Sequence, residues 1–112
     1  RHIEKSEMLP RLARALAALR QLNSDTTIDQ ALILLEVARN PGITTAGLMA
    51  EIPGLTQSST SRNTNALSSL HRKGTPGLGL LDLRPDPNES RRYCFWLTKR
   101  GLEVVGGVLE AM

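Results

Sequence analysis

The chain has 112 residues and a formal net charge of +3, from 14 Lys and Arg residues against 11 Asp and Glu residues. This length predicts one domain with a modest hydrophobic core. No apolar run approaches the roughly 18 residues that span a bilayer, which argues against a membrane protein. The chain opens at Arg1, without Met and without the pattern of a signal peptide. We therefore expect a processed or excised fragment of a soluble protein.

The Cys and His content argues against a metal centre, a cofactor or an enzyme active site. Cys94 is the one cysteine, so it forms no internal disulfide, which suits a reducing cytoplasm. Cys94 is either a small apolar residue of a half-buried strand or a redox sensor. His2 and His71 lack further ligands at metal-binding spacing. No nucleophile with an adjacent base and no phosphate loop stands out.

Two helices are predicted in the first third of the chain. The first has leucines at alternating spacings of three and four residues: Leu9, Leu12, Leu16 and Leu19. This repeat indicates an amphipathic helix. Pro10 fits its first turn, so residues 1–8 would form a separate segment or fray. A second helix is expected from about Ile28 to Arg39, and Asn40-Pro41-Gly42 ends it.

A short third helix, Ala46 to Ile52, is predicted to begin at a cap formed by Thr44 or Thr45 and to close at Pro53-Gly54. Thr56 is then a good cap for a fourth helix that runs to about Lys73 and stops at Gly74. Two helices joined by a tight turn containing Gly indicate a helix-turn-helix.

The fourth predicted helix is rich in hydroxyl and amide groups, which lower helix propensity by roughly 0.5 kcal/mol each relative to Ala. A 3.6-residue repeat divides this helix into two faces. The face expected to point outward carries Ser58, Ser61, Arg62 and Asn65, and the face expected to point inward carries Thr60, Thr64 and Leu67. Such donors and acceptors can contact base edges and phosphates in a DNA major groove. This helix is therefore expected to contact DNA.

A β-hairpin and a last helix are predicted for the remaining third. Leu80 to Arg84 and Arg92 to Leu97 are typical of strands, joined by a turn over Pro85–Ser90. Tyr93, Phe95 and Leu97 would share one face, so this wing strand would also form a wall of the core. The last helix, from about Lys99, contains Gly106-Gly107, which weaken it by roughly 1 kcal/mol each relative to Ala. It therefore needs packing against the first helix or a second subunit.

At this point the chain resembles the MarR family of bacterial winged-helix transcription regulators, over about residues 28–101. The family has a Leu-Ser/Thr-Gln-Ser-Thr-x-Ser-Arg-x-x-x-x-Leu recognition helix, and the matching residues here are Leu55, Thr56, Gln57, Ser58, Ser59, Ser61, Arg62 and Leu67. Its Asp-Pro wing turn and Leu-Thr-x-x-Gly segment match Asp86-Pro87 and Leu97–Gly101. The resemblance implies a mainly α-helical winged helix-turn-helix domain with a small β-hairpin and flanking terminal helices.

Three departures from the family pattern stand out. Thr60, Asn63 and Thr64 occupy positions where the family usually has aliphatic residues facing the core. That side of the helix is expected to be packed differently or to be wetter. Thr75–Gly79 resembles an insertion that could shift the wing, and Ser90 replaces the usual wing-tip Arg, although Arg91 and Arg92 follow it.

We expect a sequence-specific transcription regulator that binds double-stranded DNA, and a repressor rather than an activator. Between Arg62 and Arg100, eight Lys and Arg residues stand against three Asp and Glu residues, which favours polyanion binding. Arg62 would contact guanine or phosphate, Asn65 adenine or phosphate, and Gln57 a base near the helix start. The full set of expected DNA contacts is Thr44, Thr45, Gln57, Ser58, Ser59, Ser61, Arg62, Asn65, Arg84, Arg91 and Arg92. Each could instead be an ordinary solvated polar residue, as could His71, Arg72 and Lys73 at the predicted helix end.

Three parts of one compact domain are expected: an N-terminal dimerisation helix in residues 1–27, the winged helix in 28–98, and a C-terminal dimerisation helix in 99–112. The leucine stripe of the first helix and the glycine-weakened last helix predict a homodimer. The expected location is the cytoplasm, and the expected source is a bacterium, an archaeon, a phage or a plasmid. A small-molecule effector is common in the family, but no pocket is evident in the sequence. The alternative function is a winged helix that binds another protein without contacting DNA, because a fold does not fix its use.

Overall fold

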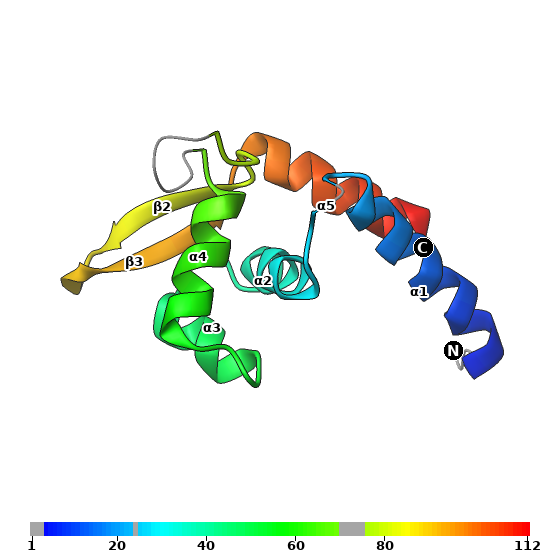
Figure 1. Cartoon of the computed structure of the whole chain (residues 1–112), viewed down its shortest axis with the longest axis horizontal. Coiled ribbons are helices and arrows are strands. Elements are labelled where there is room, and N and C mark those ends of the chain that lie inside the picture. The colour runs from blue at the N-terminus through cyan, green and yellow to red at the C-terminus, as the bar shows by residue number, and fades with distance from the viewer. Residues whose placement is uncertain (1–3, 24, 70–75) are drawn as a thin grey trace.

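The computed structural model describes residues 4–23, 25–69 and 76–112 of the chain. Within them lie five helices and three strands (Figure 1): α1 Lys5–Arg20, α2 Ile28–Arg39, β1 Ile43–Thr44, α3 Thr45–Glu51, α4 Gln57–Leu67, β2 Leu81–Asp86, β3 Glu89–Leu97 and α5 Lys99–Ala111. This arrangement confirms the predicted winged helix-turn-helix with terminal helices. None of these helices combines the length and the hydropathy required to cross a membrane.

The hydrophobic core lies where α2, α3, α4, β3 and α5 meet. Its most buried side chains, each no more than 2% exposed, are Ile33, Leu34, Val37, Leu48, Leu67, Leu80, Leu81 and Phe95. Phe95 forms the predicted core wall of the wing strand, whereas Tyr93 and Trp96 remain 51% and 37% exposed. Arg39 links α2 to α3 at the surface, through its guanidinium bonds to Glu36 and Glu51 at 3.0 and 3.2 Å.

Helix α1 begins earlier than predicted. It starts at Lys5, so Pro10 lies inside the helix and residues 5–8 continue α1 instead of fraying or forming a separate segment. A proline at this position leaves only the Ser6 carbonyl without its helical donor. Ser6 is exposed, so water can satisfy that carbonyl. The first half of α1 extends beyond the rest of the fold, and α5 runs beside its second half (Figure 1).

The sheet contains a strand that the sequence did not predict. Ile43 and Thr44 of β1 pair with Phe95 and Cys94 of β3, and β2 pairs with the other edge, giving the order β1-β3-β2 with antiparallel pairs. The hairpin is also longer than predicted, because Pro85, Asp86 and Glu89 belong to the strands. The predicted turn over 85–90 was therefore too long: the turn is confined to Pro87 and Asn88.

Helix α4 ends at Leu67, so the prediction that it runs to about Lys73 was wrong. The carbonyls of Ala66 and Leu67 accept hydrogen bonds from the N–H groups of Leu78 and Leu80, at 3.0 and 2.7 Å, instead of from a further helical turn. Ser68 is extended and pairs with Leu81 at the edge of the sheet. His71, Arg72 and Lys73 lie outside the described residues.

The junction between the hairpin and α5 depends on a glycine. Thr98 caps α5 by accepting from the Gly101 N–H at 3.0 Å, and its hydroxyl donates to the Gly79 carbonyl at 2.7 Å. The backbone of Leu80 lies so close that a Cβ at Gly101 would collide with its carbonyl oxygen. The Leu-Thr-x-x-Gly segment is thus a packing requirement of this junction.

Gly101→Ala is expected to lower the free energy of unfolding by about 1–3 kcal/mol, because the added methyl meets backbone that must shift. Urea unfolding monitored by circular dichroism would measure the change. Gly107→Ala in the same helix is the matched control, because nothing lies within 4 Å of its added Cβ. That variant should gain about 0.5–1 kcal/mol through helix propensity. Equal losses in both variants would contradict the packing argument.

Candidate nucleic-acid interface

Helix α4 is stabilised at its start by a capping box and along its inner face by its own hydroxyl groups. Thr56 accepts from the Ser59 N–H at 3.1 Å, and Ser59 accepts from the Thr56 N–H at 3.0 Å, which confirms Thr56 as the cap. Thr60 and Thr64, only 0% and 3% exposed, donate to the carbonyls of Thr56 and Thr60 at 2.7 and 2.8 Å. These hydroxyls are therefore satisfied within the helix, and the inner face needs no added water for them.

The opposite face of α4 is open. Gln57, Ser58, Ser61 and Arg62 are exposed, and Asn65 is half-buried. Arg62 makes no hydrogen bond or ion pair with any other described residue. The predicted split between an inner and an outer face is confirmed by these exposures. The Ser58 hydroxyl lies 3.3 Å from the Thr56 hydroxyl, whereas the side chains of Gln57, Ser61 and Asn65, like that of Arg62, make no hydrogen bond to another described residue.

Two of the predicted contact residues have their hydroxyls engaged in helix caps. Ser59 belongs to the capping box with Thr56. Thr44 caps α3 and accepts from the Gly47 N–H at 3.0 Å. Each hydroxyl keeps some capacity to contact a phosphate, but its main role in the fold is structural. Thr45 is the first residue of α3 and is half-buried.

A groove of about 700 Å³ separates α4 and the start of α3 from the hairpin. Seven of the predicted contact residues line it: Thr44, Thr45, Gln57, Ser61, Asn65, Arg91 and Arg92. Residues that sequence reasoning missed also line it, among them Met49, Leu83 and Tyr93. The sequence could have identified Tyr93 as a groove residue. It lies two residues before Phe95 on the same face of the strand, and its ring carries a polar hydroxyl.

An irregularity in the hairpin accounts for the placement of two neighbouring arginines. Pro85 pairs with Tyr93, but Asp86 pairs with Glu89, so residues 90–92 are extra on β3. Side chains on a regular strand alternate between faces, whereas a bulge redirects them. Arg91 and Arg92 are both exposed and both line the groove. The wing therefore presents two cations on the side facing α4.

Arg84 lies apart from these residues. Its guanidinium bonds the Asp82 carboxylate at 3.1 Å and lies over the Trp96 ring, 5.4 Å from the centroid. Because it neighbours groove-lining Leu83 on a strand, its side chain projects from the other face of the hairpin. The structure thus groups Arg91 and Arg92 with α4, and separates Arg84 from them. Ser58 and Arg62 lie on the exposed surface of α4 beside the groove rather than in its lining.

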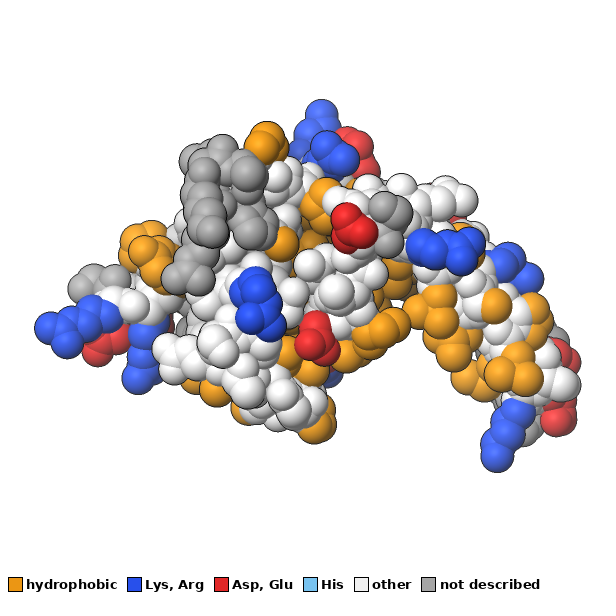
Figure 2. Space-filling view, viewed as in Figure 1, with side chains coloured by type: hydrophobic (Ala, Val, Ile, Leu, Met, Phe, Trp, Pro, Cys, Tyr) orange, Lys and Arg blue, Asp and Glu red, His pale blue; other side chains and the backbone are white. Residues whose placement is uncertain are grey.

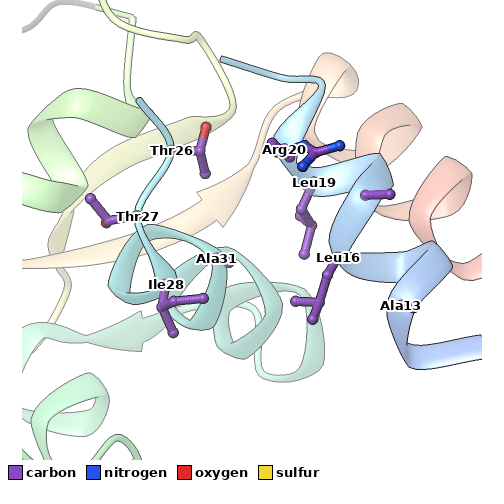
Figure 3. A pocket seen from close by; sticks show the side chains of 9 residues that line it. Ala13, Leu16, Leu19, Arg20, Thr26, Thr27, Ile28 and Ala31 are labelled. Carbon is purple, nitrogen blue, oxygen red and sulfur yellow. The ribbon is translucent and has the colours of Figure 1, made fainter. Parts of the chain in front are cut away.

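A second cavity, of about 530 Å³, lies between α1 and the start of α2 (Figure 3). Its walls are mainly apolar: Ala13, Leu16, Ala17, Leu19, Ile28 and Ala31. Arg20, Thr26 and Thr27 add polar groups. The buried Thr26 hydroxyl has no hydrogen-bond partner in the described part of the chain. A buried donor of this kind is costly unless a ligand or water pairs with it.

The terminal helices expose large apolar side chains. These are Met8, Leu9, Leu12 and Leu16 on α1, and Leu102 and Leu109 on α5, with exposures between 45% and 67%. In Figure 2 hydrophobic side chains gather along the part of the molecule where Figure 1 shows α1 extending beyond the rest of the fold. Contiguous exposed apolar side chains are typical of interaction surfaces.

Solved structures with the same fold are transcription regulators. A transcriptional regulator from Thermotoga maritima superposes with a TM-score of 0.77 at 21% identity, over 96% of this chain and 68% of that one. A MarR family transcription regulator gives 0.64 at 24% identity, over 91% and 62%. The PcaV regulator from Streptomyces coelicolor, in complex with its natural ligand, gives 0.61 at 26% identity, over 99% and 77%. No protein-family model and no curated protein matches the sequence.

The chain spans between 62% and 77% of the lengths of these three structures. At sequence identities of 21–26% the similarity shows a shared fold. The resemblance drawn from the recognition-helix and wing motifs is confirmed at that level, since the superposition extends well beyond the motifs, over at least 91% of the chain in each case.

Proposed function

We propose that this chain, which has the winged-helix fold of the MarR-type regulators, is a sequence-specific double-stranded DNA-binding transcription regulator and acts as a repressor in the cytoplasm. One observation carries the proposal. The unpaired Arg62 on the outer face of α4 lies beside a groove, and Arg91 and Arg92 line that groove. A helix with free donors and a cationic wing supply the base and phosphate contacts that such a regulator needs.

The test is selection of bound duplexes from a random-sequence library, followed by sequencing. We expect an enriched motif, because the outer face of α4 offers a guanidinium, amides and hydroxyls that distinguish base edges. Recovery of no motif, with pull-down of a protein partner instead, would favour a winged helix that binds proteins.

Replacing Arg91 and Arg92 by Ala should weaken binding to all duplexes about equally. The slope of log affinity against log salt should become shallower by roughly 0.9 for each phosphate that the wing no longer neutralises. Fluorescence anisotropy over a salt series measures both quantities. The matched control is Arg39→Ala with Arg84→Ala, which removes the same charge from two exposed positions outside the lining of the groove. An unchanged slope in the wing variant would remove the wing from the interface.

The proposed assembly is a homodimer through α1 and α5. The support is the set of exposed apolar side chains on both helices, together with their mutual packing, in which Arg14 Nε donates to the Ala111 carbonyl at 2.9 Å. A second copy would cover this surface and place two α4 helices on one duplex.

We further propose that the α1–α2 cavity binds a small-molecule effector with an apolar body and a hydrogen-bond acceptor or anionic group. The apolar walls, the Arg20 guanidinium and the unpaired Thr26 hydroxyl support this chemistry. Benzoate is a suitable first probe. At concentrations above its dissociation constant it should raise the melting temperature, and Thr26→Val should reduce that rise. Equal rises in both proteins would exclude Thr26 as a contact.

A further inference from the structure

A pair of amide side chains joins the recognition helix to the helix behind it. Gln30 of α2 donates from Nε2 to Asn63 Oδ1 of α4 at 3.3 Å, and Asn63 is only 7% exposed. It is the one side-chain hydrogen bond between α2 and α4 among the described residues. The neighbouring polar residues of the inner face, Thr60 and Thr64, bond within their own helix instead.

This hydrogen bond constrains α4 in a way that apolar packing does not. Burial of aliphatic side chains is non-directional, and repacked apolar cores lose a unique arrangement before they lose stability. A hydrogen bond weakens steeply away from its preferred distance and angle. Asn63 directly precedes Thr64 on the inner face and directly follows Arg62 on the outer face, so any rotation of α4 about its axis moves both neighbours together.

Gln30 is itself fixed at its backbone. Its N–H donates to the hydroxyl of Thr27, the cap of α2, at 3.1 Å. The amide that contacts Asn63 therefore projects from the first, capped turn of a helix that also supplies Ile33 and Leu34 to the core. A rigid base of this kind suits a contact that sets the position of another helix.

We propose that Gln30 is a positioning residue for the recognition of DNA bases. Through its hydrogen bond to Asn63 it fixes the rotation of α4 about its axis, and thereby the direction in which Arg62 projects. The inference rests on the proposed DNA-binding function. It also accounts for a polar residue at position 63, where an aliphatic residue would bury more apolar surface.

The test uses Gln30→Met, Asn63→Leu and the double variant. Gln30→Met keeps the length of the side chain without the donor. Each single change leaves one amide unpaired and should lower the melting temperature, whereas the double change removes both partners and should recover it. The affinity ratio between a selected and a scrambled duplex at one salt concentration should nevertheless fall about fivefold in the double variant. The salt slope should stay unchanged, because the same phosphates are still neutralised.

Gln21→Leu, at an exposed position, is the control and should keep both the ratio and the slope. A preserved ratio in Gln30→Met and in the double variant would overturn the positioning role alone. A wild-type protein that prefers no duplex would overturn the proposed function, and this inference with it.

Discussion

Arg62→Ala is expected to cost about 1–3 kcal/mol of binding on the preferred duplex and less on a scrambled one. Arg62 is the one long side chain with several donors on the outer face of α4, and it has no partner among the described residues. Its planar guanidinium can donate to both major-groove acceptors of guanine at once and carries a positive charge. The hydroxyl and amide side chains of this face are shorter and uncharged. Binding curves on both duplexes at one fixed salt concentration measure the difference.

Arg84→Ala is the matched control for this experiment, because the structure pairs Arg84 with Asp82 and Trp96 on the other face of the hairpin. We expect it to change the affinity for both duplexes little. If Arg62→Ala weakens both duplexes equally, Arg62 contacts the phosphate backbone; if it weakens neither, α4 does not face the DNA.

Leu12→Glu combined with Leu109→Glu is expected to convert a dimer into a monomer and to weaken duplex binding on the order of 100-fold. Both side chains are exposed in the single chain, at 55% and 61%, so the fold itself should survive. A dimer that engages two half-sites gains affinity through effective concentration, and a monomer loses that gain. Light scattering at tens of micromolar, with circular dichroism to verify folding, measures the first effect and anisotropy the second.

Arg11→Glu serves as the control for the dimer experiment, since it lies beside Leu12 on the exposed surface of α1 and changes charge without removing an apolar group. It should remain dimeric. A wild-type protein that is monomeric under these conditions would contradict the proposed assembly.

Local signals in the sequence predicted the starts of α2, α3, α4 and α5 well, but not that of α1. Thr27, Thr44, Thr56 and Thr98 all cap helices by accepting from a first-turn N–H. Thr56 had been predicted as a cap, and so had Thr44 or Thr45, because a hydroxyl just before a helical segment is a local cue. The start near Lys99 had also been predicted. The division of α4 into two faces followed from helical periodicity alone.

The features that the sequence did not predict depend on distant partners. Helix α4 ends early because the N–H groups of Leu78 and Leu80 donate to its last carbonyls, those of Ala66 and Leu67. Strand β1 exists because Ile43 and Thr44 meet β3, and two residues alone carry no periodicity. The bulge that directs Arg91 and Arg92 to one groove, and the Gln30–Asn63 pair, likewise require tertiary register.

The salt dependence of binding to the selected duplex tests the central claim most directly. If α4 and the wing contact DNA as proposed, log affinity should fall linearly with log salt, with a slope of about −0.9 per phosphate neutralised, and the selected duplex should bind more tightly than its scrambled counterpart at every salt concentration. Binding that is independent of salt and equal for both duplexes would contradict the account.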